Sequence, residues 1–175
     1  MQTFKDSLKK SSIQFLDIIK PEIIKILKCE FCIVEGVTTE KMALTLDMLA
    51  GIDVWSINKK LGMYGIALRT QTGNRDWHTY TIRHIRDSGA KTEYEKRKYA
   101  IENNRLYPYL TIQSYVTNTN KLISYAIAKT KDIIKMIDDG NCTENRTGTS
   151  QIGQASFFVV DWYEMQKAGY KVIIN

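Results

Sequence analysis

The sequence is poor in residues that interrupt or cross-link a chain. It has two prolines and ten glycines in 175 residues, which argues against a disordered protein or a long linker. Its three cysteines are an odd number, so we expect no disulfide framework and a cytoplasmic location. No apolar run approaches the roughly 20 residues of a membrane-spanning helix, and the N-terminus shows no secretory signal pattern.

Positive charge is concentrated in the middle of the chain. Residues 59–105 hold eleven Lys and Arg against five Asp and Glu, an excess that equals the net charge of +6 for the whole protein. A basic central segment in an otherwise neutral chain predicts a polyanionic partner, most simply nucleic acid, with DNA favoured over RNA. For the run Lys96-Arg97-Lys98 alone, a solvated helix face is the preferred interpretation.

Hydrophobic spacing predicts an α/β protein, formed as a single domain over residues 1–175, with a central mixed sheet flanked by helices. The predicted helices are 4–28 (split or kinked at Pro21), 92–103, 130–137 and 163–168. The predicted strands are 52–57, 63–71, 79–83, 109–116, 122–128, 156–160 and 171–174. Within 38–49, a short helical turn and a strand at 42–46 are both compatible with the pattern. The polar segment 141–153 is expected to be the most mobile loop.

Two neighbouring predicted strands carry residues suited to phosphodiester chemistry. Asp53 follows Gly51-Ile52 at the start of one strand, and Arg69 lies near the end of the next. Such strands can hold a carboxylate and a cation side by side, where the carboxylate binds Mg²⁺ and the cation steadies a phosphate. Residues 67, 69 and 71 share one strand face because side chains alternate. The alternative for Asp53 is a turn residue that caps the loop after Gly51.

The succession of a helix, a hairpin containing Gly51-Ile52-Asp53 and Ile66-Ala67-Leu68-Arg69, a third strand and a helix resembles the core of the PD-(D/E)XK nuclease superfamily. The resemblance covers roughly residues 4–103. It implies a PD-(D/E)XK nuclease-like fold in which Asp53 is the acidic residue of the motif. Arg69 falls at the position of the superfamily lysine, and Ala67 falls where the second acid stands.

This resemblance implies a catalytic set of Asp53, Arg69, Gln71 and Asp47, with Mg²⁺ held by Asp53 and Asp47. Glu22 or Glu30 are alternative sources of the missing carboxylate. Arg69 does not lose its proton in proteins, so it cannot act as a base, although it can clamp a phosphate with two hydrogen bonds.

Aromatic and basic residues alternate in the segment that contains Trp77, His78, Tyr80, Arg83 and Arg86. This pattern suits bases that stack on rings while guanidinium groups hold phosphates. Because 78 and 80 face opposite to 77 and 83 on a strand, only one set can face a ligand, and a core position for Tyr80 is slightly favoured. The predicted nucleic-acid contacts are Lys59, Lys60, Arg75, Arg83, Arg86 and Lys91.

Two other patterns have both a functional and a structural interpretation. Ser88-Gly89-Ala90-Lys91 precedes the helix 92–103 and could hold a phosphate at its N-terminus, but Thr92 and Glu95 form a capping-box pattern that explains the same residues. Cys29 and Cys32 could bind zinc with His78 and His84, although small buried cysteines are favoured because the histidine spacing is poor.

The sequence therefore predicts a nucleic-acid-binding protein on a nuclease-like fold, with Mg²⁺-dependent phosphodiester hydrolysis as its expected reaction. The alternative is a catalytically inactive module, typical of phages and other mobile elements, that binds nucleic acid or a nucleic-acid-processing protein. The absent second acid at Ala67 favours the alternative, while Asp53 and the adjacent Arg69 favour hydrolysis.

Overall fold

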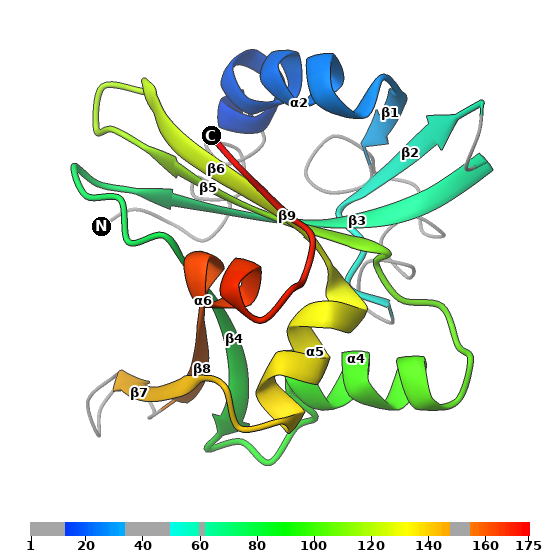
Figure 1. Ribbon diagram of the computed structural model, residues 1–175, viewed down its shortest axis with the longest axis vertical. Coiled ribbons are helices and arrows are strands. Elements are labelled where there is room, and N and C mark those ends of the chain that lie inside the picture. Colours follow the sequence, from blue (N-terminus) through cyan, green and yellow to red (C-terminus); the bar gives the residue numbers. More distant parts are fainter. Residues whose placement is uncertain (1–12, 34–49, 60–61, 148–154) are drawn as a thin grey trace.

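The computed structural model describes residues 13–33, 50–59, 62–147 and 155–175, which form two β-sheets and several helices (Figure 1). The helices are η1 (Phe15–Ile19), α2 (Lys20–Leu27), α4 (Glu93–Glu102), α5 (Thr130–Asp138) and α6 (Trp162–Lys167). The strands are β1 (Glu30–Ile33), β2 (Val54–Asn58), β3 (Gly62–Thr72), β4 (Thr79–Arg86), β5 (Leu110–Val116), β6 (Leu122–Lys129), β7 (Thr143–Thr147), β8 (Ala155–Asp161) and β9 (Val172–Ile174). No helix in these described ranges is long and apolar enough to cross a bilayer.

The larger sheet is mixed and has the strand order β1-β2-β3-β5-β6-β9. All pairs are antiparallel except β3 and β5, which run parallel with Ile66 opposite Leu110. A parallel pair needs a long crossover, and here residues 73–109 supply it with β4 and α4. The crossover therefore brings α4 back toward the sheet at the position where β2 and β3 carry the predicted motif.

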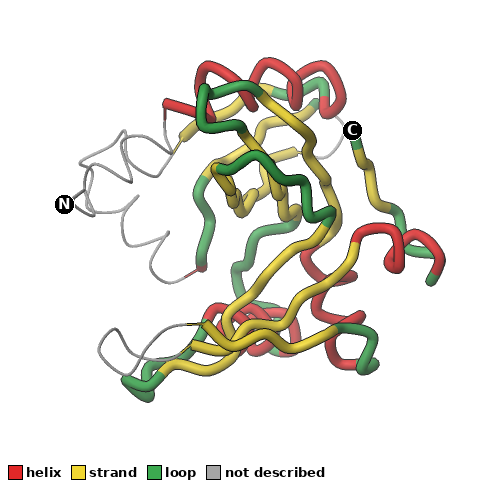
Figure 2. Tube along the Cα trace, turned by 90° about the vertical axis from the view of Figure 1, so that its left-hand side faces the viewer, coloured by secondary structure: helices red, strands yellow, loops and turns green. Residues whose placement is uncertain are grey.

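The two faces of the larger sheet pack against different layers. On one face, Ile19 and Ile23 of the first helices pack on apolar side chains of β2, β3, β5 and β6. On the other face, Ala126 and Ala128 of β6 pack with α5, α6 and the smaller sheet. Figure 2 shows the first helices at one end of this stack and the smaller sheet at the other. The sheet is thus buried from both sides, as the prediction of a helix-flanked mixed sheet requires.

The smaller sheet was not predicted. Its strand order is β4-β8-β7, so the predicted third strand at 79–83 lies outside the central sheet. Tyr80 pairs with Val160 of β8, a partner 80 residues away that hydrophobic spacing cannot reveal. Part of the polar segment 141–153, predicted as a loop, forms β7 and pairs with β8. A polar sequence is compatible with this position because β7 is an edge strand.

The first helix differs from the prediction at Pro21. The helical path is continuous from residue 13 to Leu27, and Pro21 lies in the first turn of α2 directly after the π-helical segment η1. Proline has no N–H to donate to the preceding turn. Next to Pro21 the chain changes from π-helix to α-helix and does not divide into two separate helices. Residues 4–12 of the predicted helix and the whole segment 38–49 lie outside the described residues.

Candidate active site

Asp53 lies at the point where the chain enters β2, and its neighbours fix its position. Gly51 adopts φ +64°, a backbone conformation that favours glycine. Ile52 is completely buried and anchors the turn in the core. Oδ2 of Asp53 then accepts a hydrogen bond from the backbone N–H of Leu68 at 2.5 Å. The carboxylate therefore joins the start of β2 to β3.

Arg69 lies on β3, one residue beyond that hydrogen bond, and its guanidinium reaches toward β4 and α4. Nη1 donates to the backbone oxygen of Thr81 and, at 3.0 Å, to its Oγ1. Nη2 lies 3.4 Å from Oε2 of Glu93. These contacts give Arg69 a structural role, because it links the larger sheet to the smaller one. Its side chain is 35% exposed, so it remains accessible from solvent.

Glu93 brings a second carboxylate to the same place from the first turn of α4. Thr92 caps this helix, and Thr92 and Glu95 form the reciprocal capping box that the sequence predicts. Oε1 of Glu93 lies 2.6 Å from Nη2 of Arg97, one turn further along α4. The same oxygen accepts a hydrogen bond from the hydroxyl of Tyr80 at 3.2 Å. Glu93 thus contacts three different partners on β3, β4 and α4.

Arg97 is buried, which corrects the prediction that Lys96-Arg97-Lys98 form a solvated face. Its side chain is 5% exposed, while Lys96 is exposed and Lys98 pairs with Asp138 at 2.8 Å. Nη1 of Arg97 donates to the hydroxyl of Tyr80 at 2.5 Å. Tyr80 is 1% exposed, which confirms its core position, and burial raises its pKa to about 12.

The charges in this cluster stabilise one another. Burial alone would raise the pKa of Glu93, but Arg97 and Arg69 outweigh it and hold that pKa below its ordinary value. Burial alone would lower the pKa of Arg97, yet its neighbours, including Glu93 and Asp53, raise it. Both residues are therefore ionised at neutral pH. Asp53 and Glu93 are the two carboxylates of the cluster, and Arg69 and Arg97 are the two cations.

These residues line one cleft with a volume of about 360 Å³. The lining includes Asp53, Ala67, Arg69, Tyr80, Glu93 and Arg97. Ile66 and Leu68 pack against the first helices, so Ala67 and Arg69, which alternate with them, lie on the opposite face of β3, where Asp53 also lines the cleft. Arg69 points into a polar cleft and not into an apolar core. The cleft has the size and charge pattern to receive one anionic group together with a small cation.

The other candidate catalytic residues that the structure describes do not line the cleft. Gln71 is exposed and is not part of the lining. Glu22 pairs with Lys25 at 2.8 Å on α2, which packs on the opposite face of the sheet. Glu30 lines a different groove, beside the end of α2. Asp47 lies outside the described residues.

The predicted nucleic-acid contacts that the structure describes come from several separate elements. Lys59 precedes β3 and Arg75 follows it, and β3 is an eleven-residue strand with a length of about 35 Å. The ammonium of Lys91 lies 5.1 Å from the ring of Tyr99 on α4. Lys60 lies outside the described residues. Arg83 and Arg86 are both on β4, the strand that Arg69 contacts.

Arg69, Arg83 and Arg86 form a group of mutually repelling cations near the cleft. The pKa of Arg83 is lowered, first by burial and then by the positive charges of Arg86 and Arg69. Its guanidinium lies 5.4 Å from the ring of Phe157. Its Nε is buried and has no hydrogen-bond partner among the described residues. An anion at this position would relieve the repulsion and accept this hydrogen bond.

The zinc hypothesis finds no support in the positions of the two histidines. His78 lies 3.2 Å from Asp76, and His84 lies 3.3 Å from Glu144. Cys29 is buried, and the side chain of Cys32 is outside the described set. Across the described ranges, no group of three or more His, Cys, Asp or Glu is placed to hold a metal ion.

Sequence reasoning missed Glu93 and Arg97, the two cleft residues that come from α4. Their spacing of four residues is typical of an ion pair on one helix face, and this signal was available. Their burial was not, because it depends on how the crossover returns over the sheet.

Comparisons with protein-family models, with curated proteins and with solved structures found no match to this chain.

Proposed function

We propose that this protein binds nucleic acid and hydrolyses phosphodiester bonds at the Asp53 cleft with the help of Mg²⁺. The observation that carries the proposal is the meeting of Asp53, Arg69 and Glu93 in one cleft. The sequence lacks an acid at position 67, and Glu93 supplies a carboxylate to the same cleft from another element. A helix, three antiparallel strands, the crossover and the parallel strand β5 also support the resemblance to the PD-(D/E)XK core.

The donor set fits Mg²⁺ better than it fits zinc. Mg²⁺ keeps several waters and is held by one or two carboxylates together with substrate phosphate, so Asp53 and Glu93 suffice. When bound there, Mg²⁺ supplies an activated water and stabilises negative charge on the phosphate. Arg69 then has the task of orienting the phosphate, because its permanent charge suits a phosphate contact and rules out proton abstraction.

Substrate phosphates are expected to approach from the side of β4. Arg83 and Arg86 lie on this strand, beyond the position where Thr81 contacts Arg69. The buried Nε of Arg83 and the mutual repulsion of the three arginines both favour an anionic ligand. A nucleic-acid backbone presents such charges in a row, and its binding releases counterions.

A second candidate function is binding without hydrolysis, and the contacts of Glu93 favour it. Oε1 faces Arg97 and Tyr80, and Oε2 faces Arg69. A metal ion would have to compete with these cations for the carboxylate. The contact with Arg69 is the longest of them at 3.4 Å, and it is the one that metal binding would break first.

Separate assays of cleavage and binding distinguish the two functions. Single-stranded, duplex and branched DNA and single-stranded RNA are incubated with wild type and with Asp53→Asn in Mg²⁺ or Mn²⁺. Hydrolysis predicts that wild type cleaves at least one substrate and that Asp53→Asn binds it equally well without cleaving it. Binding by both proteins without cleavage supports the second candidate. Absence of binding at low salt contradicts both functions.

A further inference from the structure

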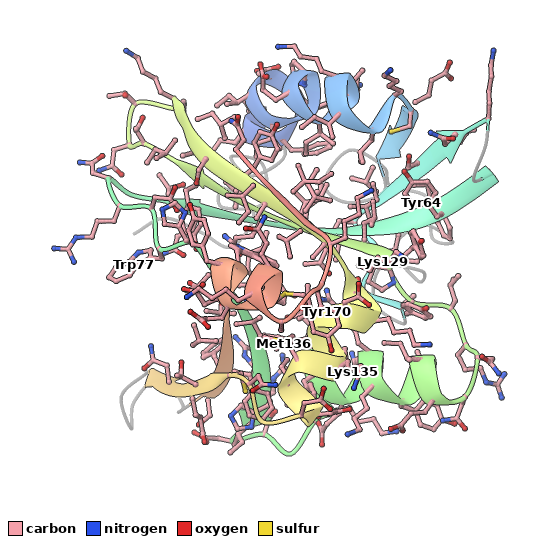
Figure 3. The ribbon with its side chains drawn as sticks, viewed as in Figure 1. Tyr64, Trp77, Lys129, Lys135, Met136 and Tyr170 are labelled. Carbon is pink, nitrogen blue, oxygen red and sulfur yellow. The ribbon has the colours of Figure 1, made fainter. Side chains whose placement is uncertain are left out.

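Two exposed aromatic side chains, Trp77 and Tyr163, flank the hydrogen-bonded residues His78 and Trp162 at the start of β4. Trp77 is 51% exposed and Tyr163, in the first turn of α6, is 44% exposed. His78 connects them, because its ring lies 5.1 Å from that of Tyr163 in an edge-to-face arrangement. Its backbone oxygen also accepts a hydrogen bond from the N–H of Trp162 at 3.0 Å. Figure 3 shows Trp77 projecting away from the molecule on the side of α6.

Side-chain hydrogen bonds fix the backbone on both sides of this site. Asp76 Oδ1 accepts from the N–H of His78 at 2.9 Å, and His78 adopts φ +49°, which is uncommon for a residue other than glycine. Asp161 caps α6 by accepting from the N–H of Tyr163 at 2.8 Å. The two rings are therefore presented by ordered backbone, which lowers the entropy cost of binding a ligand.

The surroundings of these rings are charged and not apolar. The guanidinium of Arg75 lies 5.5 Å from the centre of the Trp77 ring. Glu164 and Lys167 on α6 form an ion pair at 2.6 Å. A protein-binding patch typically has an apolar centre, whereas an exposed ring beside a cation suits a flat base attached to a phosphate.

We propose that Trp77 and Tyr163 form a stacking platform for an unpaired base of the nucleic acid whose backbone follows β4. This inference rests on the proposed nucleic-acid binding. β4 begins at Thr79, two residues after Trp77, and Arg83 lies four residues further along it, about 13 Å in an extended strand, so a single strand of a few nucleotides reaches from Arg83 to Trp77. In a regular duplex, neighbouring base pairs cover the faces of each base. The platform therefore selects single strands, or junctions with an unpaired end, over blunt duplex.

The test compares the affinity of wild type, Trp77→Ala and Tyr163→Ala for a 20-nucleotide single strand and for a 20-base-pair blunt duplex at one salt concentration. The measurement is fluorescence anisotropy of labelled DNA. Loss of a stacked base should weaken single-strand binding by about 5- to 100-fold and change duplex binding less than about twofold. Trp77→Phe should keep most of the affinity, because phenylalanine also stacks.

Tyr99→Ala is the matched control, because Tyr99 is also 51% exposed and also lies beside a cation, Lys91, but on α4. Equal losses for Trp77→Ala and Tyr99→Ala, equal losses for single strand and duplex, or no loss for Trp77→Ala would overturn the platform. If these results accompany tight wild-type binding, nucleic-acid binding stands and only the platform fails. If wild type binds neither DNA at low salt, the proposed function fails and the platform fails with it.

Tryptophan fluorescence gives an independent measurement that does not depend on affinity changes. Trp162 is buried and Trp55 is half-buried, so Trp77 is the most exposed of the three tryptophans. Saturating single-stranded DNA should quench wild type and leave Trp77→Phe almost unchanged. Equal quenching of the two proteins contradicts stacking on Trp77.

Discussion

The carboxylate of Asp53 accepts a hydrogen bond from the backbone N–H of Leu68 at 2.5 Å. This contact joins the strand that begins after Asp53 to the strand that carries Arg69. A carboxylate and a guanidinium therefore line the same cleft, and Ala67 also forms part of its wall. The predictions below concern how this cleft is built and what it binds.

Replacing Glu93 by Gln should destabilise the protein, because Arg97 would remain buried without its carboxylate. We expect a loss of about 2 kcal/mol, less than the roughly 3–5 kcal/mol of a fully buried pair, because Glu93 is partly exposed. Urea denaturation at pH 7 measures it. Glu164→Gln, which removes an exposed pair with Lys167, is the control and should change stability by less than about 1 kcal/mol. Equal effects of the two substitutions would contradict the assigned role of Glu93.

The stabilising effect of Glu93 should depend on pH in a defined direction. Its pKa is lowered in the folded protein, so its contribution is fully present above the unfolded pKa of about 4.3 and is lost as pH falls through the folded pKa. The stability difference between wild type and Glu93→Gln should therefore be constant from pH 7 to about 5.5 and shrink below about pH 4. A stability difference between the two proteins that shrinks as the pH rises would contradict this prediction.

Gly65 should not tolerate a side chain, because an added Cβ would lie 2.5 Å from Cδ1 and 2.7 Å from Cγ1 of Ile52. Ile52 is completely buried and cannot move aside. Gly65→Ala should cost about 1–3 kcal/mol, whereas the control Gly73→Ala, which meets nothing within 4 Å, should cost less than about 1 kcal/mol. Ile52→Val removes Cδ1 and should recover part of the loss in the double variant. Additive effects would show that the two residues are not in contact.

Arg83 and Arg86 should set the salt dependence of nucleic-acid binding. If each contacts one phosphate, the double substitution to Ala should reduce the slope of log K against log salt by about 1.8 for duplex DNA. The control double variant Lys25→Ala/Lys121→Ala removes two positive charges from exposed positions, one on α2 and one in the β5–β6 turn. It should leave the slope unchanged. The same slope for wild type and the arginine variant would exclude these phosphate contacts.

A carboxylate at position 67 should strengthen metal binding, because Ala67 lines the cleft beside Asp53. Ala67→Glu should raise Mn²⁺ affinity roughly tenfold, since affinity for hard cations follows the charge of the ligands. Calorimetry measures this affinity. Ala67→Gln has the same shape without the charge and controls for packing, because Ala67 is 2% exposed. Equal Mn²⁺ affinity for the Glu and Gln variants would show that position 67 does not face the metal.

The sequence predicted the local elements of the cleft better than its long-range contacts. The pair β2 and β3, the capping box at Thr92 and the shared face of Ala67 and Arg69 depend on alternation and short spacing, which a sequence displays directly. The pairing of β4 with β8, and the packing of α4 that buries Arg97, depend on residues far apart in the chain. For this reason local patterns favour Asp47, Glu22 or Glu30 as the second carboxylate, whereas Glu22 and Glu30 lie away from the cleft and Glu93 lines it.

The most direct test of the central claim is a crystal structure of the protein grown with Mn²⁺, which replaces Mg²⁺ and gives an anomalous signal. The account predicts an anomalous peak contacted by Asp53 and Glu93, with Arg69 moved away from Glu93, and no such peak in Asp53→Asn. A fully occupied Mn²⁺ elsewhere and none in this cleft, or a peak that persists unchanged in Asp53→Asn, would contradict it.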